Sequence, residues 1–420
     1  MRPTISLAMI ARDRARELTR VLGCMREHVD EIVVVDAGGS EDDTCEVARS
    51  FGAKVVEFLS SEHPEAFYDD VPERFARHEI PGPYTGRKAL ADFSTPRNAS
   101  FAACTQDLIL WLDSDDIVKN PEKIRDVVQV MVDKDLESVF FRYDYEHDEQ
   151  GRCITRQIRE RIVRRADFQS GKVRWKFPIH EHLTGLSKGG LFEEVTIVHQ
   201  SKVQDSSVVE KNGLHIYTAH RDKVSFRNLK NLIVEKERLE AAGENMPWRL
   251  AFYLGTEMRP IDPEAAIKHL FEYLGKSLWD EERSQARAFI AQIREMQLRN
   301  EEAWDLYAGA AMDFPSNPSP WFGMARVAFV RGQWDKVIEL SEKGFAQVGD
   351  GVIKKPALVT NPLEWQYRAH LPYSRALIEI GRIEDALKSC EAGLSVEPEC
   401  KFLAEHKAMC IERIENEKAA

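Results

Sequence analysis

The sequence of 420 residues lacks the two glycine-rich fingerprints that most often mark a nucleotide-binding turn. It contains neither Gly-x-Gly-x-x-Gly nor Gly-x-x-x-x-Gly-Lys, so a dinucleotide-binding turn or a phosphate loop of the familiar type is not expected. Long apolar runs are also missing, since none approaches the roughly 18 residues that a membrane-spanning helix needs. The apolar run 5–11 is too short for a signal peptide and is followed at once by Arg12 and Asp13. A soluble, cytoplasmic protein without a membrane partner is therefore expected.

Cysteine is scarce and forms no pattern. The seven cysteines are an odd number without any Cys-x-x-Cys pair, which favours reduced structural thiols over a disulfide framework. The net charge of −12 opposes general binding to phosphate backbones, so a nucleic-acid partner is disfavoured. The composition is otherwise that of a soluble globular chain, and its length favours two domains.

The first part of the chain alternates between strand and helix patterns. Apolar runs over residues 5–10, 31–36 and 54–58 predict buried strands, and apolar residues at helical spacing over 14–28 and 44–51 predict helices. A succession of this kind favours a parallel sheet with right-handed crossovers. The sequence therefore predicts an α/β first domain on a mostly parallel sheet.

Residues 60–90 interrupt this alternation with four prolines and many charges. They are interpreted as a long surface insertion near the sheet edge, either functional or passive. The pattern then resumes with a helix over 94–105, a strand over 108–112, a helix over 121–134, and strands over 138–145 and 153–165 joined by a hairpin loop.

The strand over 108–112 ends in Asp113-Ser114-Asp115-Asp116, which brings three carboxylates to one end of the strand. Ligands of open α/β sheets bind at the carboxyl edge, so these side chains are candidates for a binding site. Clustered carboxylates repel one another, and Mg²⁺ or Mn²⁺ relieves that repulsion. The alternative is a solvated acidic turn that caps the next helix, but the position after a buried strand favours the metal site.

Other polar residues are predicted at the same edge. Asp36 ends the second strand before a glycine-rich turn, and Arg97 lies near the start of the next helix. Glu181 stands between two histidines, and His199 ends a short strand predicted over 195–199. These residues place further nitrogen and carboxylate groups in the same half of the chain as the aspartates.

From residue 225 onward the strand patterns vanish and helical periodicity takes over. Two sets of residues separated by about one 34-residue period fit tetratricopeptide (TPR) spacing, and a third set follows an inserted loop over 349–362. Stacked helix pairs give a concave surface suited to an extended peptide or another subunit, or they simply brace the first domain. The three sets are Ala303, Tyr307, Ala310 and Pro315; Trp321, Ala325, Gly332, Trp334 and Gly344; and Gly381, Ile383, Ala386, Gly393 and Pro398.

Three motifs carry a resemblance to a known family. Val-Val-Val-Asp-Ala-Gly-Gly-Ser at 33–40, Asp-Phe-Ser-Thr-Pro-Arg-Asn at 92–98 and Trp-Leu-Asp-Ser-Asp-Asp at 111–116 together resemble a family 2 glycosyltransferase of the GT-A fold. Residues 161–165 and 179–181 resemble a branch in which TPR repeats follow the catalytic domain, a group that includes peptide S-glycosyltransferases of bacteriocin pathways.

The resemblance implies a GT-A domain, with a Rossmann-like and mostly parallel sheet, over residues 1–220. An all-α TPR-like domain over 225–420 is then expected to follow it.

The resemblance also implies roles for single residues. Asp36 matches an acid that contacts the nucleotide base, and Arg97 matches an arginine near the nucleotide. Asp113 and Asp115 match the Asp-x-Asp pair of a metal site, and His199 matches a histidine that completes the metal shell in some relatives. The expected nucleotide-sugar residues are Ile10, Ala11, Arg12, Asp36, Gly38, Arg97, Asp113 and Ser114, and the expected ligands of Mn²⁺ or Mg²⁺ are Asp113, Asp115 and His199.

The base that deprotonates the acceptor is the least defined role. Glu181 lies near the matching position, and Asp116 stands where the branch more often has glutamate, so these two are the candidate catalytic residues. Asp144 and Asp148 stay open as alternatives. The branch also has a shorter link where this chain carries the insertion 60–90.

The implied reaction is an inverting, metal-dependent transfer of a sugar from a nucleoside-diphosphate sugar, with a UDP-sugar as the first expectation. The metal would stabilise the charge of the leaving group, and a carboxylate would take the proton of the attacking acceptor. The acceptor is expected to be a protein or peptide bound through the repeats, and a homodimer is kept as one option.

Two alternative functions are considered. One is a glycosyltransferase that acts on a modified nucleic-acid base or on a glycan. The other is a non-enzymatic repeat scaffold with a degenerate transferase domain, which the intact Asp36, Arg97, Asp113 and Asp115 disfavour.

Overall fold

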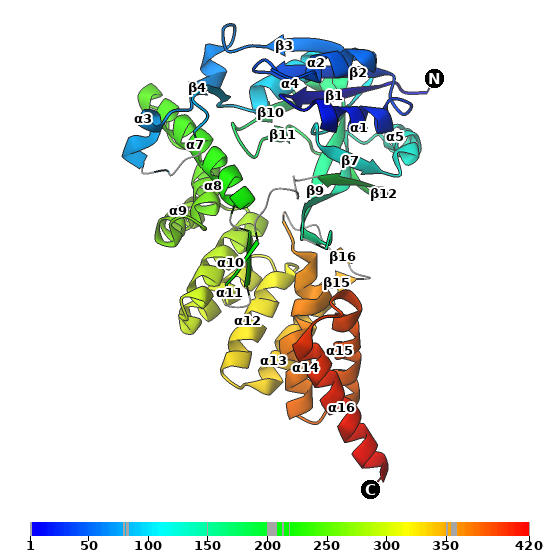
Figure 1. The fold of residues 1–420 in the computed structure, drawn as a ribbon, viewed down its shortest axis with the longest axis vertical. Coiled ribbons are helices and arrows are strands. Elements are labelled where there is room, and N and C mark those ends of the chain that lie inside the picture. Colours follow the sequence, from blue (N-terminus) through cyan, green and yellow to red (C-terminus); the bar gives the residue numbers. More distant parts are fainter. Residues whose placement is uncertain are drawn as a thin grey trace. The chain divides into compact units, whose positions relative to one another are not determined.

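The computed structural model describes residues 2–78, 80, 84–148, 150–199, 208–211, 214–217, 219–349, 352–353 and 359–419 (Figure 1). Its contacts divide the chain into two compact units, residues 1–150 with 157–257 and residues 151–156 with 258–420. The helices that follow residue 225 therefore begin within the first unit. The limits of the two predicted domains, at 220 and 225, stay a prediction.

The first unit is built on an eight-stranded sheet of order β3-β2-β1-β6-β9-β8-β12-β7. The first four strands in this order run parallel. Beyond them β9 is antiparallel to β6, β8 and β12 run parallel, and β7 is antiparallel to β12. The expected Rossmann-like α/β class is confirmed, with a mixed half added to the parallel half. The strands are β1 (Ile5–Ala11), β2 (Glu31–Ala37), β3 (Lys54–Phe58), β6 (Leu108–Trp111), β7 (Asp116–Lys119), β8 (Ser138–His147), β9 (Cys153–Arg164) and β12 (Gly189–His199).

Both faces of the parallel strands are buried, as their unbroken apolar runs predict. On one face Leu7 and Leu110 belong to a cluster that includes side chains of α1 (Ala15–Met25), α2 (Thr44–Ser50) and α5 (Ile124–Asp133). On the other face Ala8 and Trp111 pack with Phe101 of α4 (Ser94–Ala103) and with residues near α6 (Arg165–Gln169). The helices on both faces hold the parallel strands in place, so the residues that follow the carboxyl ends of these strands meet at one edge of the sheet.

The strand predicted over 195–199 is longer than expected, since β12 begins at Gly189. Its pairing with β8 shifts register between Phe192 and Thr196. A bulge of this kind interrupts the side-chain alternation by which a strand is recognised in a sequence, so only the part after the bulge was predicted.

The insertion 60–90 packs on the sheet. In its described part β4 (Phe67–Asp69) pairs antiparallel with β5 (Lys88–Leu90), and α3 (Pro72–Phe75) lies between them in sequence. Phe67 and Leu90 join Ile10 and Ala37 in one buried cluster. The insertion therefore covers the ends of β1 and β2 instead of extending into solvent.

Six further elements belong to the first unit: β10 (Arg174–Lys176), β11 (His182–Thr184), the β-ribbon β13 (Val208–Lys211) with β14 (Leu214–Tyr217), and helices α7 (Ala219–Ala242) and α8 (Trp248–Met258). α7 is tied to the insertion through a buried ion pair, in which Lys230 Nζ lies 2.5 Å from Asp70 Oδ1.

The second unit is helical, and its TPR-like character confirms the predicted class. Gly332 and Gly381 take equivalent places in the turns of two successive helix pairs, with φ of 66° and 84°. A β-carbon at Gly323 would lie 2.5 Å from the ring of Tyr307, so the helices that carry them approach closely. The helices are α9 (Pro263–Lys276), α10 (Asp280–Met296), α11 (Asn300–Asp313), α12 (Pro318–Val330), α13 (Trp334–Ala346), α14 (His370–Glu379), α15 (Ile383–Val396) and α16 (Lys401–Ala419), with a short ribbon of β15 (Val348–Gly349) and β16 (Val352–Ile353).

Two predicted loops lie partly outside the described residues, at Glu149 in the hairpin and at 350–351 and 354–358 in the repeat insertion. Within the described part of the chain, no helix combines the length and apolarity needed to cross a bilayer.

Candidate active site

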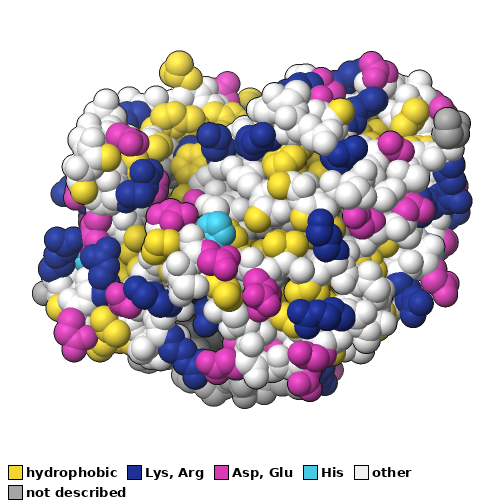
Figure 2. All heavy atoms as spheres, turned by 90° about the horizontal axis from the view of Figure 1, so that it is seen from above, with side chains coloured by type: hydrophobic (Ala, Val, Ile, Leu, Met, Phe, Trp, Pro, Cys, Tyr) yellow, Lys and Arg dark blue, Asp and Glu magenta, His cyan; other side chains and the backbone are white. Residues whose placement is uncertain are grey.

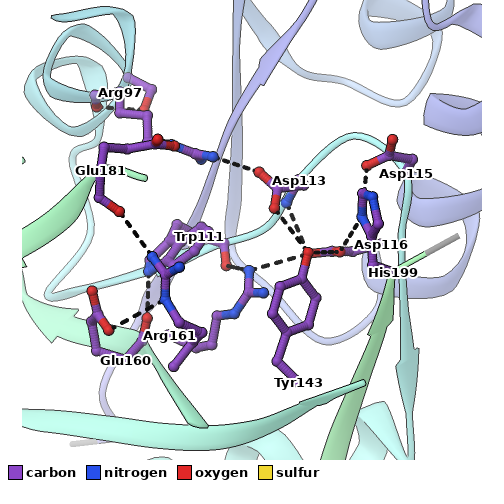
Figure 3. Close-up of polar contacts among 12 residues, drawn as sticks. Arg97, Trp111, Asp113, Asp115, Asp116, Tyr143, Glu160, Arg161, Glu181 and His199 are labelled. Carbon is purple, nitrogen blue, oxygen red and sulfur yellow. Dashed lines mark hydrogen bonds and ion pairs between the residues drawn. The ribbon is translucent and has the colours of Figure 1, made fainter. Parts of the chain in front are cut away.

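The acidic turn joins β6 to β7 at the carboxyl edge of the parallel strands (Figure 3). Two hydrogen bonds close it: the N–H of Asp113 donates to Oδ2 of Asp116 at 3.0 Å, and the N–H of Asp116 donates to the carbonyl of Asp113 at 3.1 Å. The side chains of Asp113 and Asp115 are 24% and 21% exposed, whereas that of Asp116 is fully buried. Ser114 is buried as well. The turn thus keeps two of its three carboxylates accessible to solvent.

Asp116 is held by buried partners. Arg161 Nη1 lies 3.1 Å from its Oδ2, and the hydroxyl of Tyr143 donates to its Oδ1 at 3.0 Å. The same hydroxyl lies 3.2 Å from Asp113 Oδ2 and so links the two aspartates. The Arg161 guanidinium lies 3.9 Å from the ring centroid of Trp111 and 4.2 Å from that of Tyr143. These contacts suit a residue that orders the turn, and a catalytic role of Asp116 stays a prediction.

Arg97 of α4 bridges two carboxylates from distant parts of the chain. Its Nη2 lies 2.5 Å from Asp113 Oδ1, and its Nε lies 2.6 Å from Glu181 Oε1. The guanidinium is buried, with the ring centroids of Trp111 and Trp175 at 4.8 and 5.0 Å. The guanidinium of Arg97 therefore pairs both with Asp113, a predicted nucleotide-sugar residue, and with Glu181, a predicted base.

His199 ends β12 opposite Asp116 of β7 and faces the acidic turn. Its Nδ1 lies 3.3 Å from Asp115 Oδ1 and 3.6 Å from Asp116 Oδ1, which are ion-pair distances, and among the described residues this buried nitrogen has no hydrogen-bond partner. The imidazole stacks on Tyr145 with centroids 4.9 Å apart. Ligand atoms of Asp113, Asp116 and His199 lie within 4.8 Å of one another. The predicted metal ligands were Asp113, Asp115 and His199, so this group differs from the prediction in containing Asp116 instead of Asp115.

The charges of the turn are unequally compensated. For Asp113, burial is outweighed by the charges of Arg97 and Arg161, which hold its pKa well below the usual value. Burial raises the pKa of Asp115, and although His199 opposes this, the pKa stays above its ordinary value. Burial alone would lower the pKa of His199, but the carboxylates of Asp116 and Asp115 raise it to about 9. An added cation would therefore gain most beside Asp115, where it could replace the proton of His199.

The predicted base-contacting acid lies at the same edge, two strands away from β6. Asp36 stands opposite Ala11 in the β1–β2 pair, and β1 lies between β2 and β6. Its carboxylate accepts two hydrogen bonds from Ser40, at 2.9 Å from the N–H and 2.7 Å from the hydroxyl. These bonds close the glycine-rich turn, and contact with a nucleotide base stays a prediction.

The other predicted nucleotide-sugar residues lie beside Asp36. Ile10 and Ala11 are buried at the end of β1. Gly38 has φ of 113°, and a β-carbon there would lie 2.8 Å from Nη1 of Arg12. Arg12 Nη1 in turn donates to the carbonyl of Lys88 at 3.2 Å, so the insertion helps to fix this arginine.

Three of the four candidate bases lie outside the acidic turn. Glu181 is buried on the loop between β10 and β11, and Arg97 connects it to the acidic turn. Asp144 is buried opposite Val198 in the β8–β12 pair, and Asp148 is buried just after the end of β8. The link through Arg97 favours Glu181, although the identity of the base stays a prediction.

Sequence reasoning missed the aromatic and cationic residues that hold this site. Arg159 and Arg161 project to the same face of β9, as residues two apart on a strand do, and both guanidinium groups lie over Trp111. Arg161 interrupts the apolar end of β9, where a charge is costly unless it is paired. That conflict was the signal for a buried partner, but it did not identify Asp116 or Tyr143.

Comparison with known proteins gives two kinds of distant relative, while no family model matches the chain. The SPbeta prophage-derived glycosyltransferase SunS of Bacillus subtilis and the glycosyltransferase SunS of Bacillus phage SPbeta are each 22% identical over 279 residues, which is 66% of this chain and 53% of theirs. A TPR repeat-containing protein of Synechococcus elongatus is 34% identical over 112 residues, 27% of this chain and 20% of that protein. The chain thus spans about half or less of the length of these curated relatives.

Among solved structures, YrrB, described as a TPR protein with an unusual peptide-binding site, aligns with 43% of this chain and 84% of its own. The identity is 13% and the TM-score 0.34, a likeness too low to support an argument. The sequence similarities nevertheless agree with the predicted resemblance to a glycosyltransferase that carries TPR repeats.

Proposed function

We propose that this chain, a distant relative of the glycosyltransferase SunS, transfers a sugar from a nucleoside-diphosphate sugar to a protein or peptide acceptor, with inversion at the anomeric carbon. The observation that supports this most is that His199 Nδ1 lies 3.3 Å from Asp115 and 3.6 Å from Asp116, beside Asp113, at the sheet edge that also holds Asp36. A UDP-sugar is the first donor to test.

The residues present fit a divalent cation. Carboxylate oxygens and one imidazole nitrogen suit Mn²⁺ or Mg²⁺, and the buried Nδ1 of His199 has no hydrogen-bond partner in the part of the chain that the structure describes. Asp115 and His199 would hold the ion, with Asp113 as a further carboxylate, while Asp116 keeps the turn in shape through Arg161. When bound, the ion would supply positive charge to the diphosphate leaving group.

Arg97 and Glu181 supply the acceptor side of the proposal. The Arg97 guanidinium pairs with both Asp113 and Glu181. The carboxylate proposed for the donor side and the candidate base are therefore positioned by the same side chain. In the proposed reaction the acceptor heteroatom attacks the anomeric carbon, its proton passes to Glu181, and the diphosphate leaves from the opposite face. A single displacement of this kind inverts the anomeric centre, as in inverting glycosidases.

A peptide acceptor agrees with the repeats, because stacked helix pairs offer a surface for an extended chain. It also agrees with the charge distribution: on the face drawn in Figure 2, lysine and arginine side chains are interspersed with aspartate and glutamate. Together with the net charge of −12, this disfavours the alternative of a nucleic-acid acceptor.

The test is hydrolysis of a panel of UDP-, GDP- and dTDP-sugars with and without Mn²⁺. We expect at least one to be cleaved only with metal, and Asp115→Ala to lower the rate by about 100-fold or more. Asp126→Ala, at an exposed site of α5, should retain the native rate. The proposal fails if no member of the panel is cleaved, or if Asp115→Ala is as active as the native chain. Mass spectrometry after incubation with peptides that contain serine, threonine or cysteine then identifies the accepting atom.

A further inference from the structure

The loop that carries Glu181 has an unusual backbone. Phe177 and His180 have φ of 77° and 56°, a region that residues with large side chains rarely adopt. Such a conformation persists where surrounding contacts determine it. The contacts of this loop therefore indicate what holds Glu181 in place.

Helix α8 contacts the residue before Glu181. Nε2 of His180 lies 2.7 Å from Oε1 of Glu257, and the same oxygen accepts a hydrogen bond from Asn228 Nδ2 of α7 at 3.0 Å. Glu257 is only 7% exposed. The His180 ring also stacks on Tyr253 of α8, with centroids 4.6 Å apart and an interplanar angle of 22°.

The same helix contacts the residue after Glu181. Nη1 of Arg249 lies 3.0 Å from Nε2 of His182, and its guanidinium lies 5.7 Å from the ring centroid of Phe177. Burial and the charge of Arg249 lower the pKa of His182 to about 3, so this imidazole is neutral near neutral pH. It stacks on Phe177 with centroids 5.3 Å apart. Both neighbours of Glu181 are thus fixed from α8.

Glu181 itself is held by residues of α4 and β9. Its carboxylate pairs with Arg97, and its carbonyl accepts a hydrogen bond from Arg159 Nη2 at 3.0 Å. The N–H of Leu183 donates to Glu160 Oε1 at 3.1 Å. Residues of β9 and α4 therefore contact the loop at Glu181 and Leu183, and residues of α8 contact it at His180 and His182.

We propose that Glu257 and Arg249 are positioning residues for Glu181, and that α8 takes part in catalysis by fixing the loop through His180 and His182. This inference rests on the proposed function, in which Glu181 takes the acceptor proton. It assigns α8 to the catalytic machinery, although the sequence pattern placed this helix with the repeats.

The first test is hydrogen exchange of the full chain, read on the amides of residues 177–184. Glu257→Ala should speed exchange of these amides, because His180 loses its partner, while the isosteric Glu257→Gln should have a smaller effect. The control is Glu240→Gln on α7, where an exposed glutamate lies 3.9 Å from Lys236, and it should leave the segment unchanged. If Glu257→Ala disrupts folding, Arg249→Ala replaces it with the same expectation for His182. Unchanged exchange in a folded variant overturns the proposal.

The second test uses the sugar nucleotide that the native chain hydrolyses fastest with Mn²⁺. Glu257→Ala should lower kcat by about 10- to 100-fold, as loss of a supporting contact commonly does, and leave calorimetric binding of UDP with Mn²⁺ unchanged. In a Glu181→Gln background the same substitution should cause no further loss, because the residue on which it acts is already inactive.

The outcomes separate the two claims. Equal losses in both backgrounds would show that α8 only stabilises the fold, and the positioning role would be wrong. If the native chain hydrolyses no sugar nucleotide, the proposed function fails first and the catalytic part of this inference falls with it.

Discussion

Replacing Arg161 with methionine should destabilise the first unit far more than loss of any surface charge on the same strand. Arg161 and Asp116 both have fully buried side chains, and Nη1 lies 3.1 Å from Oδ2. Methionine keeps much of the volume between Trp111 and Tyr143 but removes the guanidinium that pairs with the Asp116 carboxylate. The backbone N–H of Asp113, the hydroxyl of Tyr143 and the imidazole of His199, whose Nδ1 lies 3.6 Å from Oδ1, remain beside that carboxylate.

The expected magnitude follows from the distance and the burial. At 3.1 Å and an effective dielectric constant of about 20, the Coulomb attraction is about 5 kcal/mol. Removing one partner of a buried pair typically costs about 3–5 kcal/mol, since the remaining charge is uncompensated. The hydrogen bonds that remain on Asp116 place the expected loss in the lower half of that range, about 3–4 kcal/mol.

The assay is urea unfolding near neutral pH, followed by tryptophan fluorescence. Arg164→Met is the matched control on β9, because Arg164 pairs with Asp135 at 2.9 Å but the two side chains are 33% and 85% exposed. That pair should contribute less than about 1 kcal/mol. The double variant Arg161→Met/Asp116→Asn should be more stable than the sum of its single changes predicts, because neither of the two positions then carries a buried charge. If Arg161→Met lies within about 1 kcal/mol of the control, the buried pair is not what orders the acidic turn.

Two further substitutions test the insertion and the repeats. Lys230→Met breaks the buried pair with Asp70 and should lower the free energy of unfolding in urea by about 3–5 kcal/mol. It should also speed tryptic cleavage within residues 72–78. The control Lys236→Met, which breaks an exposed pair, should have neither effect. Equal cleavage of the two variants would show that α7 does not hold the insertion. Gly323→Ala should destabilise the second unit by about 1–3 kcal/mol, because the added carbon would lie 2.5 Å from a tyrosine ring. Gly275→Ala should be neutral or stabilising by up to about 1 kcal/mol, because no atom of the described residues lies within 4 Å of the added carbon. Similar unfolding midpoints for the two glycine variants would contradict the close helix contact.

Local sequence patterns determined the parallel half of the sheet. A strand buried on both faces must be apolar throughout, so β1, β2 and β6 could be recognised from their composition alone. Once their order in the chain implied a parallel sheet, the residues that follow each strand had to lie at one edge. The position of Asp36 and Asp113 at that edge, and the helical character of the second half, could therefore be predicted from the sequence.

The mixed half of the sheet was predicted less completely. β8 and β9 match the strands predicted over 138–145 and 153–165, but β7 was not predicted, and only the last part of β12 was. β12 carries a bulge that breaks the alternation of buried and exposed side chains, and β7 has only four residues, which is too short for a period of two to be recognised.

Only the tertiary structure decided which charges meet. Arg97 and Glu181 are 84 positions apart, and Arg161 and Asp116 are 45 positions apart, so no local spacing relates them. Side-chain packing selected Asp116 as the aspartate that points into the core, because only there could its carboxylate reach Arg161 and Tyr143 together. The sequence by itself determined that carboxylates gather at a strand end. The fold decided which of them is neutralised inside the protein and which stay partly exposed to solvent, since a buried charge is tolerated only beside its counter-charge.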